Sequence, residues 1–524
     1  MGMLDLGATP WLLAAMVGLL TYWFRIRAKK FDFFRDRGIP GPKPSLLDGN
    51  YQDLMQSKMA PWVVMEKWFK AYGKVVGYFR IGPNPVFLLF DHDMLKEVLI
   101  KDFSRFSDRP TLVNPKDRDS IPAIFRYALT MITGQDWKRV RSTIAPTFTA
   151  KKMKGMSPKM NGIMDVMLGI LDDKAHSGET IDIYGLFQGL TLDVIGNCAF
   201  AMNTDCLRNP DEIFLASVKT IFAGFSSPII RFLQMFPEFN FFIGRLIKLT
   251  AHTQRGNELS GHLENLIKQR REGKLNGHMD MIQLMLDANE NPESVDRTDN
   301  GDAFSDVRKK YLTEAEMISN AFLFLLAGYE TTANCLAFTT YLLAKHPDIQ
   351  ERVYEEIRDE LGLQTTPDYE KAQNLPYLEM VIAESLRLFP PVTSFVTRLA
   401  SETVTIDGVT IPAGAGVEVP LWYLQHDPEV WDRPYEFNPE RFSPENKSSI
   451  PPMAYMPFGA GPRNCVGMRF AQLEIKIAFV RILQRFRLTT CWESEPEIKL
   501  KHTTVSISPA NGVFVRLEKR LAVE

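Results

Sequence analysis

The spacing of apolar positions divides the chain into a short leading segment and a long body. Residues Leu6 to Phe24 form an uncharged run of about 19. As a helix this run would reach ~28 Å, close to the ~30 Å hydrocarbon core of a bilayer. Four basic side chains follow within positions 25–30, whereas only Asp5 precedes the run. That charge order favours an uncleaved membrane anchor, with the chain that follows it in the cytosol.

Two other interpretations of this run stay open. A cleaved signal peptide would carry its positive charge before the apolar run, and a core helix would not gather Trp and Tyr near its ends. Three prolines within Gly38 to Pro44 then predict a stiff, extended connector. We therefore divide the chain into 1–30, a transmembrane anchor with a basic stop; 31–50, a proline-rich hinge; and 51–524, the body.

The body shows long helical periodicities with few strand signals. Strands are expected at Val75 to Ile81 and Val86 to Phe90, and the stretch Val404 to Ile411 alternates around Asp407-Gly408 in a hairpin pattern. Residues 287–310 are polar and rich in turn formers, which indicates a solvated connection, with a regulatory segment as the alternative. The predicted fold class is mostly α with small β-sheets.

One segment is unusually rich in phenylalanine. Eight Phe residues lie between positions 214 and 242, and Pro228 and Pro237 break the segment into short pieces. The segment either roofs a substrate cavity or dips into a membrane. The plainer alternative is a pair of amphipathic helices packed on the core.

Composition excludes several classes of function. The 524 residues are 45% hydrophobic and 24% charged, which suits a globular protein with a large core. A formal charge of −2 gives no attraction to phosphate backbones, so nucleic acid is not an expected partner. The five cysteines form no CxxC pair, so neither a disulfide framework nor a cysteine-built zinc site is expected.

The stretch Phe458 to Gly467 carries the strongest chemical signal. Its glycines allow close approach to a flat group, Arg463 can meet an anion, and Cys465 stands just before a long amphipathic helix from about Gly467 to Phe486. We expect the positive end of that helix and Arg463 to lower the pKa of the thiol and hold it as thiolate. Such a thiolate suits a metal.

This loop resembles that of the cytochromes P450, whose haem-binding motif FxxGxRxCxG is matched at Phe458, Gly461, Arg463, Cys465 and Gly467. The resemblance implies the cytochrome P450 fold with an N-terminal single-pass membrane anchor. It also implies haem b, with Cys465 as the axial iron ligand. A buried structural cysteine in a glycine-rich loop is the alternative.

Further family elements follow in order. Glu384 and Arg387 match the ExxR motif, and Arg441 lies in Pro439-Glu440-Arg441-Phe442. The resemblance implies a buried network of these three side chains that locks the cysteine loop. By itself, an ExxR pair is often only a surface ion pair.

The stretch Ala327 to Thr332 lies inside a nearly uncharged run, 317–343, that predicts a fully buried helix. It resembles the family's oxygen-activation motif. The resemblance gives Thr331 the role of a hydrogen-bond donor on the oxygen side of the haem and Glu330 that of a proton relay, while Gly328 loosens the helix. The alternative is a back-bonded Thr and a Glu paired with an Arg.

The resemblance also nominates residues around the cofactor and the substrate. The proposed cofactor-binding residues are Trp137, Arg141, Arg398, Arg463, Phe458 and Cys465, with Arg126 a weaker candidate. The proposed substrate contacts are Leu323, Leu326, Ala327, Val392 to Val396, Ile124, Phe125 and Val505. These substrate contacts are mostly apolar, so we expect apolar substrates.

The whole chain looks most similar to the animal clan that contains drug-metabolising forms and thromboxane synthase. The resemblance implies a monooxygenase that inserts one oxygen atom of O₂ into an apolar small molecule, with NADPH-derived electrons from a separate reductase. Cytochrome b5 is a second expected partner, and Lys138, Arg139 and Lys152 offer positive charge for docking. The expected location is the endoplasmic reticulum membrane and its lipid, with the catalytic domain facing the cytosol. Two alternatives are a haem-thiolate isomerase that rearranges a peroxide without reductase and a non-catalytic haem-based binder.

Overall fold

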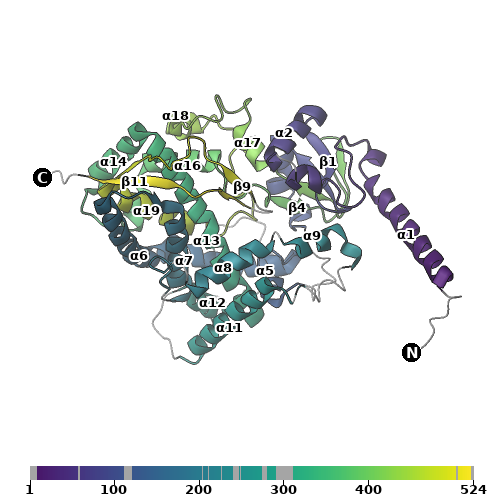
Figure 1. Ribbon diagram of the computed structural model, residues 1–524, viewed down its shortest axis with the longest axis horizontal. Helices are drawn as coiled ribbons and strands as arrows, with labels where there is room; N and C mark the ends of the chain where they lie inside the picture. The colour runs from purple at the N-terminus through teal and green to yellow at the C-terminus, as the bar shows by residue number, and fades with distance from the viewer. Residues whose placement is uncertain are drawn as a thin grey trace.

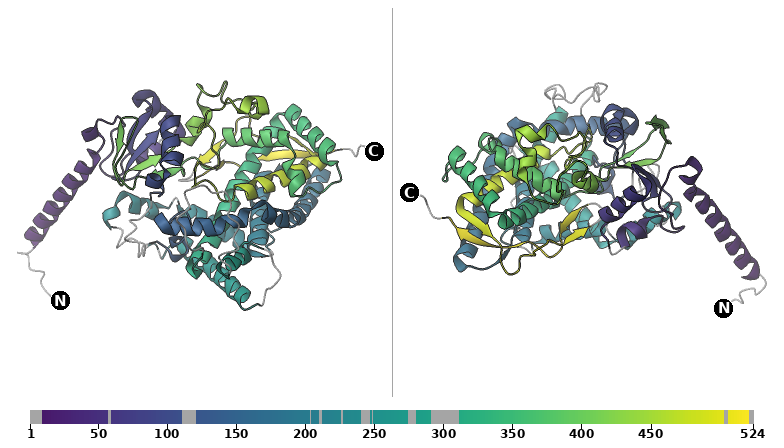
Figure 2. Two further views of the ribbon diagram at one scale, coloured as in Figure 1. Left: turned by 180° about the vertical axis from the view of Figure 1, so that it is seen from behind. Right: turned by 90° about the horizontal axis from the view of Figure 1, so that it is seen from above.

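The computed structural model describes residues 9–520 except 57–58, 111–120, 203, 210–211, 226, 240–246, 248, 274–279, 291–310 and 503–505. Figure 1 shows a body of packed helices with a strand-rich region at one side, and helix α1 (Thr9–Phe31) projects away from that side. The views in Figure 2 show the same arrangement from behind and from above.

The body is mainly helical. Its longer helices are α2 (Pro61–Tyr72), α5 (Gly134–Ile144), α6 (Ala150–Ser177), α7 (Ile183–Phe200), α8 (Ile213–Phe225), α9 (Pro228–Met235), α11 (Ala251–Arg271), α12 (Met281–Glu290), α13 (Glu314–Lys345), α14 (Pro347–Leu361), α16 (Pro376–Leu388) and α19 (Met468–Arg485). The shorter helices are α3 (His92–Lys96), α4 (Ala123–Arg126), α15 (Tyr369–Gln373), α17 (Leu421–His426) and α18 (Pro444–Lys447), and the 3₁₀ turns used below are η7 (Pro237–Phe239) and η9 (Pro439–Phe442).

The described residues also form four small sheets. The largest has the strand order β1 (Val75–Phe79), β2 (Pro85–Leu89), β7 (Gly416–Glu418), β4 (Thr397–Leu399). The others pair β3 (Ile181–Asp182) and β8 (Phe486–Thr489) with β11 (Phe514–Lys519), β5 (Val404–Ile406) with β6 (Val409–Ile411), and β9 (Leu500–His502) with β10 (Ile507–Pro509). The predicted hairpin is confirmed, because Asp407 and Gly408 both adopt the positive φ of a type I′ turn. The fold class, mostly α with small sheets, is confirmed.

Helix α13 runs through the core and positions the site. A capping box begins it: the Thr313 side chain accepts a bond from the Glu316 amide, and Glu316 Oε2 accepts one from the Thr313 amide at 2.8 Å. Nearly all of its side chains from Glu316 to Ala344 are buried. It stops at His346, because Pro347 begins α14. The sequence prediction of one fully buried helix is therefore confirmed.

Among the described helices, α13 is the only one that is long and apolar enough to cross a membrane, and 78% of its most apolar window is buried inside the protein. The anchor predicted at the N-terminus begins in residues outside the described part. From Pro10 to Phe24, the described part of α1 carries exposed apolar side chains such as Trp11, Leu19 and Tyr22.

The C-terminal end of α1 packs against the body. Arg27 is 1% exposed and donates to the carbonyls of Leu46 at 2.7 Å and Leu47 at 2.6 Å. It also pairs with Glu238 of η7 at 3.4 Å, and its guanidinium lies 5.0 Å from the ring centre of Phe236. These contacts join α1 to the phenylalanine-rich segment.

The phenylalanine-rich segment is helical over most of its described residues. Helices α8 and α9 contain Phe214, which is buried, and Phe232, which is 47% exposed. Two helices are therefore confirmed, but only α8 packs on the main core, because the buried Leu233 of α9 belongs to a separate small cluster. Positions 226 and 240–242 of the segment, and 291–310 of the polar stretch 287–310, lie outside the described residues.

Candidate active site

The cysteine loop is a close-packed turn that leads into α19. The Cys465 amide donates to the Phe458 carbonyl at 2.8 Å, which closes the loop. Gly461 has φ of +70°, and a Cβ there would lie 1.9 Å from the Leu99 carbonyl oxygen, so only glycine fits. The Cys465 side chain is exposed to an internal cavity that the loop lines together with α13 and the chain after α16.

Arg463 and Arg398 approach this cavity from different elements. The Arg463 guanidinium lies 4.2 Å from the ring centre of Trp137, and its Nη2 donates to the Ile132 carbonyl at 3.2 Å. Arg398, on β4, donates through Nη2 to the Ala460 carbonyl at 3.2 Å. The predicted side chains Trp137, Arg398 and Arg463 therefore meet at one end of the cavity.

Arg141 and Arg109 complete this cation cluster. Arg141, on α5, donates to Asn464 Oδ1 at 2.8 Å, and Arg109 donates to the Arg463 carbonyl at 3.4 Å. Sequence reasoning missed Arg109 because a lone arginine in a loop matches no spaced motif. The weaker candidate, Arg126, bonds the Ile121 carbonyl at 3.2 Å and is not among the residues that line the cavity.

The cluster carries more positive charge than the surrounding protein neutralises. Burial lowers the pKa of all four side chains, to about 10 for Arg109 and Arg141 and about 9 for Arg463, and repulsion from neighbouring guanidiniums lowers it further for Arg109, Arg398 and Arg463. The Nε atoms of Arg109 and Arg398 are buried without a hydrogen-bond partner among the described residues. Although Asp108 lies 3.5 Å from Arg463, the cluster still favours an anionic ligand, and the two propionates of a haem are suitable anions.

The expected direction of the Cys465 pKa was wrong. Burial raises the pKa of this thiol, although a bond from the Gly467 amide and the charges of Arg141 and Arg109 act to lower it. The sequence shows the N-terminus of α19 and the nearby arginines, which lower the pKa, but it does not show how deeply the thiol is buried. Because a thiol bound to a metal is deprotonated by the metal itself, the donor set still fits haem iron: one sulfur faces the cavity and cations lie beside it.

The two predicted catalytic residues point to different sides of α13. Thr331 lines the cavity, and its hydroxyl donates to the Ala327 carbonyl at 2.7 Å. Glu330 is buried and is not among the residues that line the cavity; it accepts a bond from the Ser506 hydroxyl at 3.2 Å. Burial raises the pKa of Glu330, while Ser506 and Lys501 act to lower it.

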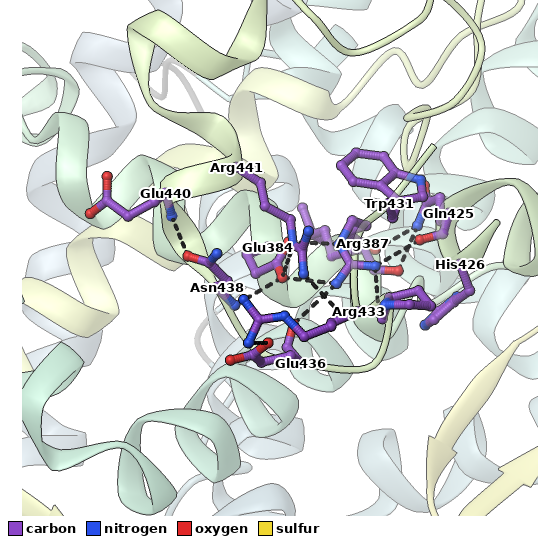
Figure 3. A network of polar contacts seen from close by, with 12 residues as sticks. Glu384, Arg387, Gln425, His426, Trp431, Arg433, Glu436, Asn438, Glu440 and Arg441 are labelled. Carbon is purple, nitrogen blue, oxygen red and sulfur yellow. Dashed lines mark hydrogen bonds and ion pairs between the residues drawn. The ribbon is translucent and has the colours of Figure 1, made fainter. Parts of the chain in front are cut away.

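The three residues of the ExxR network meet as expected, and Figure 3 shows them (Glu384, Arg387 and Arg441). Arg387 Nε and Nη2 bond the two Glu384 carboxylate oxygens at 2.7 and 2.8 Å, and both side chains are fully buried. Arg441 Nε lies 3.3 Å from Glu384 Oε1. The Glu384 carboxylate therefore accepts bonds from two guanidiniums in the interior.

This network reaches the cysteine loop through Gln425. Arg387 Nη1 donates to the Gln425 carbonyl at 2.8 Å, and the Gln425 side chain donates back to the Arg387 carbonyl at 3.0 Å. The same side chain accepts from the Met456 amide at 3.4 Å, just before the loop. The network thus has direct contact with the chain that carries Cys465.

The cavity wall is mainly apolar. Of the predicted substrate contacts, Leu323, Ala327, Val392, Phe395 and Val396 line the cavity, whereas Leu326, Ile124 and Phe125 are not among its lining residues. Val505 lies outside the described residues. The wall residues that sequence reasoning did not name include Ile195, Phe324 and Leu386.

Comparison with known proteins supports the same assignment. The profile of the family described as cytochrome P450 matches residues 39–515. Cytochrome P450 3A31 of Mesocricetus auratus is 34% identical over 99% of this chain and 98% of its own length. Cytochrome P450 3A2 of Rattus norvegicus and cytochrome P450 3A5 of Homo sapiens are each 34% identical over 98% of this chain and over 97% and 98% of their own lengths.

The similarity covers almost the whole chain, including the cysteine loop, the buried network and α13. This family uses haem b and takes electrons from NADPH through a reductase, and these relatives reside in the endoplasmic reticulum membrane. The chain belongs to the cytochrome P450 family and is a haem-thiolate monooxygenase that inserts one oxygen atom of O₂ into apolar small molecules.

Proposed function

We propose that Cys465 is the axial ligand of the haem iron, and that Trp137, Arg141, Arg398 and Arg463 hold the cofactor together with Phe458. The observation that carries this assignment is the sulfur of Cys465 facing a cavity beside the buried arginine cluster. When bound, the haem supplies the redox chemistry that activates O₂. Arg109 joins this set, because its guanidinium lies in the same cluster.

Thr331 is the proposed proton donor on the cavity side of α13. Its hydroxyl already lines the cavity, and its bond to the Ala327 carbonyl fixes the rotamer. Glu330 is the proposed proton source for Thr331, on the side of α13 that faces away from the cavity. Burial favours its protonated form, and the Ser506 hydroxyl donates to its carboxyl group. The wall around Thr331 is mainly apolar, so few other side chains there can carry protons.

The test of these roles is the balance of NADPH consumed, product formed and peroxide released. Thr331→Ala should keep haem but lower the ratio of product formed to peroxide released by up to about 10²-fold, the usual rate contribution of one acid–base group. Thr331→Ser should restore most of the coupling. Thr340→Ala is the matched control, because Thr340 is buried on α13 but is not among the cavity-lining residues. Unchanged coupling in Thr331→Ala would remove Thr331 from the reaction.

We also propose that residues 1–30 anchor the chain and that the body, after the hinge 31–50, faces the cytosol. The exposed apolar side chains of α1 and the basic residues after Phe24 support this orientation. In sealed microsomes, protease should reach the body without detergent. Protection of the body until detergent is added would place it in the lumen and contradict the proposal.

Reductase and cytochrome b5 are proposed to dock on the cysteine side of the body, and lipid to surround α1. Lys138 and Lys152 support this surface with their positive charge. Arg139 contributes less than the sequence suggested, because it pairs with Glu316 at 2.5 Å and is only 13% exposed. Reversing the charge of Lys138 and Lys152 should slow electron transfer most at low salt, and an effect that is independent of salt would argue against this surface.

A further inference from the structure

Residues 391–396, called here the wall segment, follow α16 and form one side of the cavity. Pro391, Val392, Phe395 and Val396 line it. The segment is tied at both ends, because the Ile507 amide donates to the Pro391 carbonyl at 3.0 Å and the Val419 amide to the Val396 carbonyl at 3.1 Å. Between these ties the chain is irregular.

The outer face of the wall segment borders a second, smaller gap. Thr393 and Ser394 line this gap together with Trp62 and Trp422, whose rings stack with centres 4.4 Å apart. The wall segment therefore has the cavity on one face and this small gap on the other, with the buried Val396 packed in the core at its end. Its middle needs a specific contact to hold one position.

Arg80 supplies that contact. Its Nη1 donates to the Ser394 carbonyl at 3.1 Å, in the middle of the wall segment. The same nitrogen lies 3.3 Å from Glu418 Oε2, on β7. Tyr78, which is fully buried on β1, donates its hydroxyl to the same carboxylate oxygen.

The Glu418 carboxylate fixes where Arg80 can lie. Glu418 is 1% exposed, and its other oxygen, Oε1, is buried without a hydrogen-bond partner among the described residues. Moving the Arg80 guanidinium away would leave a buried charge without its counter-ion, which is costly. Burial and the adjacent carboxylate raise the pKa of Tyr78, so its hydroxyl remains a donor. The Ser394 carbonyl is thus held by a group that cannot move freely.

Phe395, the residue after Ser394, connects the wall segment with the arginine cluster. The Phe395 ring lies 4.2 Å from the Arg109 guanidinium, one of the cations beside Cys465. A shift at Ser394 therefore moves an aromatic face of the cavity relative to the arginine cluster. We propose that Arg80, held by Glu418 and Tyr78, is a positioning residue that fixes the wall segment and so decides which ligand shapes the cavity accepts. This inference rests on the proposed assignment of the cavity as the haem and substrate site.

The experiment compares full-length holoenzymes. Arg80→Gln with Glu418→Gln removes both charges together, and Tyr78→Phe removes only the hydroxyl. The control is Arg520→Gln with Glu351→Gln, a partly buried ion pair at 3.0 Å whose residues are not among those that line the cavity. Hydrogen exchange of a peptide covering the wall segment, and spectral titration with imidazole and 4-phenylimidazole, are measured in each.

In the Arg80/Glu418 variant the wall segment should exchange about fivefold faster, the factor expected from losing one ordinary hydrogen bond. The Kd of 4-phenylimidazole should change by at least about threefold, while that of the smaller imidazole stays within about twofold. Tyr78→Phe should show the same pattern more weakly, and the control should resemble the wild type.

Wild-type exchange and a wild-type ratio of the two Kd values in both test variants would overturn the inference, even if their stability fell. If the Arg80/Glu418 variant fails to fold, the hydrogen exchange and the two Kd values of Tyr78→Phe alone decide whether the inference stands. A wild-type protein without the thiolate signature of its carbon monoxide complex would instead refute the proposed function, so the two failures are distinguishable.

Discussion

Replacing Arg387 by alanine should prevent the protein from holding haem, because this side chain balances a fully buried charge. It makes two bonds to Glu384 and donates to the carbonyls of Gln425 at 2.8 Å and Pro434 at 2.7 Å. Breaking a buried ion pair on one side costs about 3–5 kcal/mol. Each carbonyl left without a donor adds about 1–3 kcal/mol. The sum is comparable to a whole domain's stability of about 5–15 kcal/mol.

Two further variants make this reasoning quantitative. Arg441→Met removes the 3.3 Å contact with Glu384 and an exposed 3.0 Å bond to the Arg433 carbonyl, and should cost only about 1–3 kcal/mol. Arg433→Ala removes an exposed pair with Glu436 in the same segment and should cost about 0–1 kcal/mol. The assay is haem content per protein together with urea unfolding followed by the Soret band. If Arg387→Ala were as stable as Arg433→Ala, the buried network would not support the cysteine loop.

Three other predictions concern the loop, the cation cluster and pH. Gly461→Ala should abolish haem loading because its Cβ would lie 1.9 Å from the Leu99 carbonyl, whereas Gly459→Ala, whose nearest neighbour is 3.8 Å away, should load haem at a cost of about 1 kcal/mol; equal loading would contradict the close-approach argument. Arg109→Met should speed haem transfer to apomyoglobin more than Arg126→Met does, and equal rates would exclude Arg109 from the cofactor site. Burial lowers the pKa of His426 to about 3, so the unfolded chain binds the extra proton below its usual value of 6.5 and the unfolding free energy falls by about 2 kcal/mol between pH 7 and pH 5. His426→Phe should remove that share of the pH dependence, and an unchanged slope would show that His426 does not cause it.

Local patterns predicted much of this structure. The hairpin at 404–411 follows from its turn residues, and α13 follows from its long apolar run. The cysteine loop was predictable because its spacing is fixed by close approach, as the Leu99 carbonyl shows at Gly461. In each case the signal that made the feature predictable lies within one continuous stretch of sequence.

Features that depend on distant parts of the chain were not predictable. Arg109 reaches the cluster through the Arg463 carbonyl, which is far away in sequence. The pKa of Cys465 rises because the effect of burial is larger than the opposite effects of the Gly467 amide and the arginines. Burial is a property of the whole fold. Glu330 and Thr331 are adjacent and so lie about 100° apart around α13. Only the packed fold shows that Thr331 is the one that lines the cavity and that Ser506 bonds Glu330.

The most direct test of the account is the carbon monoxide difference spectrum of the dithionite-reduced protein. The wild type should show the long-wavelength Soret band typical of thiolate ligation, and Cys465→Ala should lose it while α1 keeps the protein on the membrane. A band at the shorter wavelength of a non-thiolate haem, in wild-type protein that is folded and haem-loaded, would contradict the assignment of Cys465 as the iron ligand.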